Sequence, residues 1–215
     1  MGQYYMPTLI SEDGSIRILN SHAYDNGLKL MEHSYIGNTF VNAVLTLLWK
    51  APCRLAWIGD YSDEEYGDPY EAKLSHEDFM KYYDIVWGGN YTESLVQPEP
   101  RSIHTMSTKR GYLVNHTLKV FIPIKEYIAA NIEKGRGRLI APGRIDPFYT
   151  YDMCLHPLPL LTACGNGRGC GDYCRSSTDS DLIGSWAFDL IEATSIRPAG
   201  YERRIYHFAT SENAA

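Results

Sequence analysis

Residues 164–173 read Cys-Gly-Asn-Gly-Arg-Gly-Cys-Gly-Asp-Tyr, with glycine at every second position and a single arginine. Glycine adopts positive φ angles at no steric cost, so a backbone this rich in glycine can approach a ligand closely and turn several N–H groups toward one anion. The guanidinium of Arg168 adds a planar donor fork that suits a phosphate or a carboxylate. This glycine-rich run therefore predicts a cleft that binds a small anionic or nucleotide-like ligand.

The predicted ligand-binding residues are Asn166, Gly167, Arg168, Gly169, Gly171, Asp172, Tyr173, Trp186 and Asn38. We expect Arg168 and the backbone N–H groups to hold a phosphate while Asp172 binds a hydroxyl group, and the alternative for this pair is a surface ion pair that shapes the loop. Tyr173 or Trp186 is expected to stack on the ligand, although Trp186 also fits a place in the core.

The run matches neither of the two well-known glycine codes for nucleotides. A Walker A loop ends in Gly-Lys followed by Ser or Thr, and a dinucleotide fingerprint lies between a strand and a helix of a βαβ unit. Here a proline-containing segment precedes the run and polar residues follow it. The sequence therefore indicates an anion-binding loop without indicating ATP or NAD.

Two histidines are the candidate acid and base if the protein is an enzyme. His156 directly precedes Pro157-Leu158-Pro159, and the two prolines predict an extended path that presents His156 beside the glycine-rich run. His33 begins the segment 33–38, which we expect to lie next to the run and which ends at Asn38, a predicted helix N-cap. His156 can instead be a structural imidazole bonded to a turn carbonyl, and His33 need not line the site.

Metal sites are alternatives to the prediction that no cofactor is bound. Cys154, Cys164, Cys170 and Cys174 surround the run, but their spacing departs from the paired pattern of zinc sites, and reduced cysteines are the favoured interpretation. Five acidic residues lie between positions 60 and 68, where hard oxygens could hold Mg²⁺. Asp60, which follows a predicted strand, is the candidate ligand, and a solvated acidic loop is the favoured alternative.

Length and charge set limits on the function. The 215 residues suit a single globular domain, 1–208, with a frayed tail over 209–215. A net charge of −6 provides no basic field for a long nucleic acid. Neither a secretory signal nor an apolar stretch of about 18 residues is present, so we expect a soluble cytoplasmic protein without a membrane partner.

The sequence pattern predicts that these residues are positioned by an α+β fold, with a largely antiparallel sheet and two or three helices packed on it. The expected strands cover 4–10, 15–19, 54–58, 112–117, 120–124, 148–153, 184–191 and 201–208, and the expected helices cover 38–51, 75–87 and 126–132. The first two strands flank Glu12-Asp13-Gly14, a turn signal that predicts a hairpin. Asn38 and Ser75 are good N-caps for the two longer helices.

Four segments together resemble a family of uncharacterised bacterial and bacteriophage proteins. They are Met-Gly-Gln-Tyr-Tyr at the start, residues 33–38, Trp57-Ile58-Gly59-Asp60-Tyr61, and His-Pro-Leu-Pro-Leu-Leu-Thr with the glycine-rich run. The resemblance implies no known activity and carries over no catalytic residue. A phage setting would associate the protein with evasion of host defence, which is an association and not a physical argument.

Three functions follow from the residues. The first is the binding of a small anionic or nucleotide-like ligand. The second is a hydrolase or phosphodiesterase that acts on such a ligand, with His156 and His33 as acid and base and Asp60 in an orienting or metal-binding role. The third is an interaction protein that blocks a partner through an aromatic surface, since the chain has 17 tyrosines and 4 tryptophans.

Overall fold

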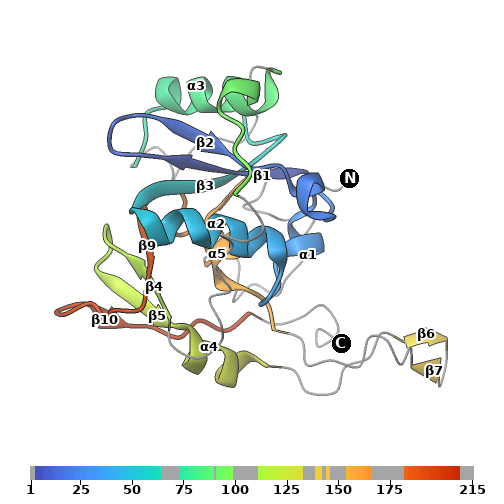
Figure 1. Cartoon of the computed structure of the whole chain (residues 1–215), viewed down its shortest axis with the longest axis vertical. Coiled ribbons are helices and arrows are strands. Elements are labelled where there is room, and N and C mark those ends of the chain that lie inside the picture. Colours follow the sequence, from blue (N-terminus) through green and yellow to red (C-terminus); the bar gives the residue numbers. More distant parts are fainter. Residues whose placement is uncertain are drawn as a thin grey trace.

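A computed structural model describes the chain over residues 3–63, 73–89, 91–98, 111–132, 139–141, 144–145, 154–165 and 182–208. Within these residues an eight-stranded, mostly antiparallel sheet is combined with five α-helices (Figure 1), so the predicted α+β class is confirmed. The glycine-rich run beyond Gly165 and the predicted tail 209–215 lie outside the described residues.

The strands of the main sheet are β1 (Tyr5–Ile10), β2 (Ile16–Ile18), β3 (Cys53–Gly59), β4 (Tyr112–Asn115), β5 (Val120–Pro123), β8 (Ala163–Cys164), β9 (Leu190–Thr194) and β10 (Glu202–Arg203). Strands β6 (Leu139–Ala141) and β7 (Arg144–Ile145) form a separate two-stranded sheet. The α-helices are α1 (Leu30–His33), α2 (Thr39–Lys50), α3 (His76–Trp87), α4 (Ile124–Asn131) and α5 (Pro157–Leu161), with 3₁₀ turns at η1 (Ser21–Tyr24) and η2 (Tyr91–Glu93).

Strand β3 lies inside the main sheet and is paired on both edges. One edge pairs with β1, and the other edge is shared by β9 and β8. The strand order is β10-β5-β4-β9-β3-β1-β2, and β1 pairs with β3 antiparallel along its full length. On the other edge, β9 pairs antiparallel with the first two residues of β3, and β8 pairs parallel with Trp57 and Ile58. The carboxyl ends of β3 and β8 therefore meet at the point where the glycine-rich run begins.

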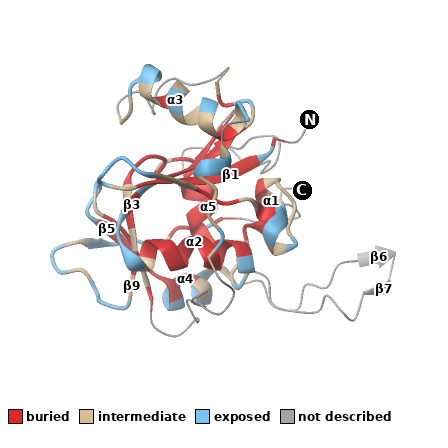
Figure 2. Cartoon of the chain, turned by 45° about the horizontal axis from the view of Figure 1, so that its top comes forward, coloured by how far each residue is buried: buried red, intermediate tan, exposed pale blue. Residues whose placement is uncertain are grey.

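Alternating side chains of the central strands supply two separate cores. Leu9, Leu55 and Trp57 point into the larger core with α2 and α5, whereas Ile10 and Ile58 point into a smaller core under α3. This period of two is the pattern expected of strands that are covered on both faces. Figure 2 shows the buried strands β1 and β3 between α3 on one side and α2 on the other.

Helix α2 is almost entirely buried, and Asn38 fixes its start. The Asn38 side-chain oxygen accepts hydrogen bonds from the N–H groups of Phe40 and Val41, and its amide donates to Asn26 Oδ1 at 2.6 Å. These bonds satisfy N–H groups that have no partner within the helix. The predicted N-cap role of Asn38 is confirmed.

Replacing this cap should weaken the fold measurably. We expect Asn38→Ala to lower the free energy of unfolding by about 1–2 kcal/mol, because two helix N–H groups lose their acceptor. Asn38→Ser, which keeps a capping oxygen, should cost less than half as much. Urea denaturation followed by far-UV circular dichroism measures both changes, and equal losses in the two variants would contradict the capping argument.

The sequence identified the three longer helices and the first five strands of the main sheet, but three other expectations need correction. Residues 157–161 form helix α5 and not an extended path. Pro157 occupies the first helical position, where the backbone N–H that proline lacks would have no acceptor within the helix. Residues 184–189 form turns, so β9 begins only at Leu190, and between 201 and 208 only Glu202 and Arg203 pair as a strand. The predicted strand 148–153 lies outside the described residues.

In the described part of the chain, no helix is long and apolar enough to cross a membrane. The longest helices there, α2 and α3, have 12 residues each. A spanning helix needs about 20 residues. This agrees with the absence of a membrane-length apolar segment in the sequence.

Candidate functional site

The described residues next to the glycine-rich run form a close-packed corner at the carboxyl ends of β3 and β8. Trp57 is paired with Ala163 and Ile58 with Cys164, so the next residues in register are Gly59 and Gly165. A Cβ atom at either glycine would collide with the side chain of Gln3, and one at Gly165 would also lie 2.7 Å from the hydroxyl of Tyr5. The close approach of Gln3 therefore requires glycine at both positions.

Gln3 brings a buried amide to this corner. Its side-chain oxygen accepts a hydrogen bond from the hydroxyl of Tyr5 at 2.6 Å, and the residue is only 2% exposed. Its Nε2 group is buried and has no hydrogen-bond partner among the described residues. Since a buried donor without a partner costs about 1–3 kcal/mol, this amide is the polar group of the corner with the most to gain from a ligand acceptor.

Asp60 follows β3 at the same corner and is held by the backbone. Its Oδ1 accepts the N–H of Tyr4 at 3.0 Å, and its own carbonyl accepts the hydroxyl of Tyr83 at 2.8 Å. Partial burial raises the pKa of the Asp60 carboxyl, and the Tyr4 hydrogen bond opposes that rise. Among the described residues no group of three or more His, Cys, Asp or Glu side chains could hold a metal ion, and the Mg²⁺ role of Asp60 stays a prediction.

His33 lies in the core with both ring nitrogens in hydrogen bonds. Its Nε2 accepts the indole N–H of Trp57 at 3.1 Å, so the proton is on Nδ1, which donates to the Gly27 carbonyl at 3.1 Å. Burial lowers the pKa of His33 to about 4. The ring also meets Phe40 edge to face, with centroids 4.9 Å apart. This environment is that of a structural imidazole in the core.

His156 caps helix α5 and is equally buried. Its Nδ1 accepts the backbone N–H of Leu158 at 3.1 Å, and burial lowers the pKa of His156 to about 3. The surrounding chain pairs with the other predicted segment, because the N–H of His156 donates to the Ser34 carbonyl and that of Ile36 donates to the Cys154 carbonyl, each at 2.9 Å. Segment 33–38 therefore contacts residues 154–156, which precede the glycine-rich run, whereas its predicted contact with the run itself and the acid and base roles stay predictions.

Trp186 and Asn38, two of the predicted ligand-binding residues, are occupied elsewhere in the structure. Trp186 is fully buried in the larger core, with its ring edge to face against Tyr206 at 5.8 Å, which is the core role named as its alternative. The side-chain oxygen of Asn38 is already bound to the N–H groups at the start of α2. A direct contact of either side chain with a ligand stays a prediction.

The remaining predicted site residues of the run fall outside the described residues, and so do Cys170 and Cys174 of the zinc alternative. Cys154 and Cys164 are buried and form no disulfide among the described residues, and burial raises the pKa of the Cys164 thiol. A raised pKa disfavours the thiolate that zinc requires. The zinc alternative stays a prediction.

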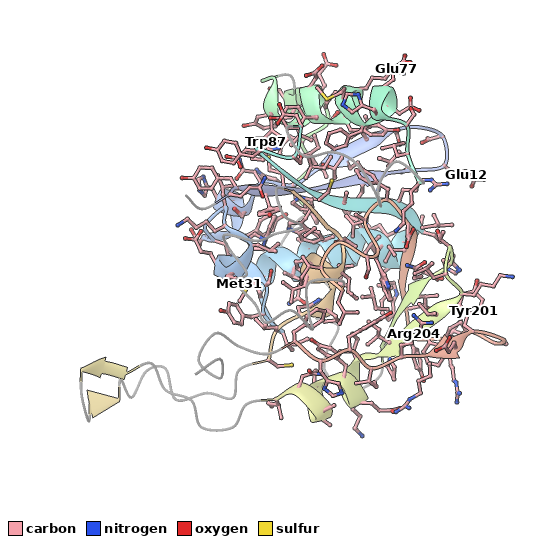
Figure 3. All side chains as sticks on the ribbon, turned by 180° about the vertical axis from the view of Figure 1, so that it is seen from behind. Glu12, Met31, Glu77, Trp87, Tyr201 and Arg204 are labelled. Atoms are coloured by element: carbon pink, nitrogen blue, oxygen red, sulfur yellow. The ribbon has the colours of Figure 1, made fainter. Side chains whose placement is uncertain are left out.

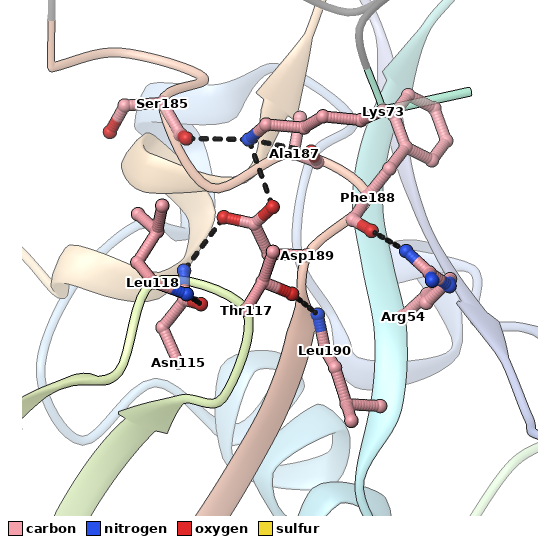
Figure 4. A network of polar contacts seen from close by, with 10 residues as sticks. All are labelled: Arg54, Lys73, Asn115, Thr117, Leu118, Ser185, Ala187, Phe188, Asp189 and Leu190. Carbon is pink, nitrogen blue, oxygen red and sulfur yellow. Dashed lines mark hydrogen bonds and ion pairs between the residues drawn. The ribbon is translucent and has the colours of Figure 1, made fainter. Parts of the chain in front are cut away.

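Sequence reasoning missed a buried ionic network centred on Asp189, drawn in Figure 4. The Asn115 side-chain amide donates to Asp189 Oδ2 at 2.7 Å, and the Lys73 ammonium lies 3.0 Å from Oδ1, off the direction of a hydrogen bond but close enough for an ion pair. Lys73 also donates to the carbonyls of Ser185 and Ala187 at 2.7 and 3.2 Å. No local pattern marks these residues, since their partners are 74 to 116 positions away in the chain.

No protein-family model matches the chain, and no curated protein or solved structure shows a significant similarity to it. The resemblance to an uncharacterised bacterial and bacteriophage family therefore stays a prediction.

Proposed function

We propose that this protein binds a small anionic or nucleotide-like ligand at the glycine-rich run. The observation that carries the proposal is the buried Nε2 donor of Gln3, which has no partner among the described residues and lies against Gly59, the neighbour in register of Gly165 in the run. In open α/β sheets, ligands are commonly held just outside the carboxyl ends of parallel strands, and the run leaves this sheet at the carboxyl ends of the parallel pair β3 and β8.

The sequence of the run supplies the complementary groups. Arg168 and the surrounding N–H groups would hold the anionic part of the ligand, Asp172 would bind a hydroxyl group, and Tyr173 would stack on a flat ring. Gln3 adds a neutral donor for a ligand acceptor. Asn38 caps helix α2 and Trp186 packs against Tyr206, so we propose that these two residues support the fold around the site and do not contact the ligand.

Binding has more support than hydrolysis by the predicted histidine pair. A general base needs a ring nitrogen with a free lone pair and a pKa near the working pH. The lone pair of His33 receives the Trp57 indole proton, and the Nδ1 lone pair of His156 receives the Leu158 N–H. Burial also lowers the pKa of both rings, to about 4 and about 3.

We expect Arg168→Ala to weaken binding of the best nucleotide or cyclic nucleotide from a thermal-shift screen by about 10- to 150-fold. That range corresponds to the loss of a charge-assisted hydrogen bond, worth about 1.5–3 kcal/mol. Isothermal titration calorimetry measures the change in Kd. Gln3→Met, which keeps the side-chain length but removes the amide, should also weaken binding.

The matched control is Arg203→Ala, which removes an arginine from β10 at the opposite edge of the sheet. It should leave the Kd of the same nucleotide unchanged. Unaltered binding by Arg168→Ala, or an equal loss in both arginine variants, would place the ligand elsewhere. If no nucleotide or simple phosphate compound shifts the melting temperature of the wild-type protein, the proposed function is wrong.

A further inference from the structure

A second group of side chains, carried by β9 and by the segments that follow β4 and precede β10, forms a hydrogen-bonded relay. His116 Nε2 lies 2.8 Å from Oε2 of Glu192, and its Nδ1 lies 2.9 Å from the hydroxyl of Tyr201. The His116 and Tyr201 rings meet edge to face with centroids 5.6 Å apart. None of these residues belongs to a site predicted from the sequence.

One tautomer of His116 satisfies both hydrogen bonds. The carboxylate of Glu192 can only accept, so Nε2 carries the proton, and Nδ1 of the neutral ring then accepts the proton of the Tyr201 hydroxyl. The result is an acid, a base and an orienting carboxylate in series. An activated nucleophile typically has this arrangement: it is hydrogen-bonded to a base, and a third group orients that base.

The relay lies on the sheet face that points away from the larger core. Ile191 and Ala193 of β9 belong to that core, so Glu192 between them projects to the opposite face. The side chains of His116 and Glu192 are 25% and 30% exposed, and Tyr201 is also partly exposed. Unlike His33 and His156, this histidine can be reached from solvent.

Cationic side chains lie in the segments that carry the relay. Arg197 belongs to the segment that leads to Tyr201 and lies over the ring of Phe121, 5.5 Å from its centroid. Lys119 is in the turn that follows His116, and its carbonyl accepts the N–H of Glu202, the residue after Tyr201. Neither cation forms an ion pair with a described carboxylate, whereas Glu202 is paired with Arg204. Figure 3 shows Tyr201 and Arg204 at this end of the molecule.

We propose that Tyr201, His116 and Glu192 form a nucleophilic site for phosphate esters, separate from the ligand-binding corner. The Tyr201 oxygen attacks phosphorus and forms an O–P bond while the P–O bond to the leaving alcohol breaks. The phenol proton passes to His116 Nδ1 and then to the leaving oxygen. Water, deprotonated by His116, cleaves the phosphotyrosyl bond and restores the hydroxyl of Tyr201.

The three residues have different roles in this reaction. Tyr201 and His116 are the catalytic residues, because they contact the reacting atoms. Glu192 is a positioning residue that holds the proton on Nε2, and Arg197 and Lys119 attract the anionic ester. The proposal does not depend on the glycine-rich run, so either proposal can fail without the other.

The test uses bis(p-nitrophenyl) phosphate as the probe and the full-length protein. We expect release of p-nitrophenolate together with a p-nitrophenylphosphoryl adduct on the peptide that contains Tyr201, detected by mass spectrometry. Tyr201→Phe, which keeps the ring contact, should abolish both signals, and His116→Gln should slow release about 100-fold or more. Tyr61→Phe, which removes an exposed hydroxyl elsewhere, should behave as wild type.

Three results would overturn the proposal. In the first, the wild-type protein releases p-nitrophenolate no faster than free N-acetyltyrosinamide does. In the second, Tyr201→Phe releases it as fast as the wild-type protein, and in the third, the adduct forms on another residue. The role of Glu192 has its own readout, because imidazole nitrogen shifts in NMR report the tautomer. Glu192→Gln should both slow release and populate the second His116 tautomer, and slower release with an unchanged tautomer would remove the positioning role.

Discussion

We expect Asp189→Ala to lower the free energy of unfolding by about 3–5 kcal/mol, the loss typical of breaking a buried ion pair. The carboxylate is 1% exposed and accepts from Asn115 while it pairs with Lys73. Removing it leaves the partly buried Lys73 ammonium without its ion-pair partner and the Asn115 amide without its acceptor. Since a typical domain is stable by about 5–15 kcal/mol, this variant should lose a large fraction of its stability, measurable by guanidinium denaturation and tryptophan fluorescence.

The control for this prediction is Asp84→Ala, on the exposed side of α3, which should change stability by less than about 0.5 kcal/mol. A double-mutant cycle gives a second check. Lys73→Met alone leaves the Asp189 carboxylate without its ion-pair partner, whereas Lys73→Met combined with Asp189→Leu removes both charges. The loss of unfolding free energy in this double variant should therefore be smaller than the summed losses of Lys73→Met alone and Asp189→Leu alone. Losses below about 1 kcal/mol in both single variants would mean that the network is not stabilising.

The parts of the fold that the sequence predicted are those that local periodicity determines. β1 and β3 alternate between two cores, and α2 has apolar residues at helical spacing behind a good N-cap. The parallel pairing of β8 with β3 joins positions more than 100 residues apart, and no local pattern records it. Helix α5 was missed because its two prolines favour an extended chain unless one of them occupies the first helical position.

In the candidate site, too, local sequence patterns predicted some features, whereas features that depend on distant partners were not predicted. The sequence singled out the glycine-rich run and the N-cap Asn38, because glycine density and an N-cap are local signals, and the N-cap is confirmed. It left His33 open as catalytic or structural, since the partner that decides its environment, Trp57, lies 24 positions further along the chain. The relay joins His116 to Glu192 and Tyr201, which lie 76 and 85 positions further along the chain, and it has no local sequence signature.

The buried neutral histidines should make the fold sensitive to acid. Burial lowers the pKa of His156 to about 3 and that of His33 to about 4, both from an ordinary value of 6.5. Between these values and 6.5 the unfolded chain binds more protons than the folded chain, so stability rises with pH in this window. The stabilisation is therefore complete above about pH 6.5 and is lost as the pH falls toward 4 and 3. A full shift of this size corresponds to a loss on the order of 4 kcal/mol for one histidine.

His156→Asn separates this titration from the capping role. Asparagine is a strong N-cap residue and offers an oxygen to the Leu158 N–H, so most of the stability at pH 7.5 should remain, while the loss between pH 6.5 and 4 becomes smaller than in wild type. Urea denaturation at half-unit pH steps measures both quantities. Ser75→Asn, which places the same cap residue on α3 without removing an imidazole, should keep the wild-type pH slope. A His156→Asn variant with the full wild-type slope would show that protonation of this buried ring does not drive acid unfolding.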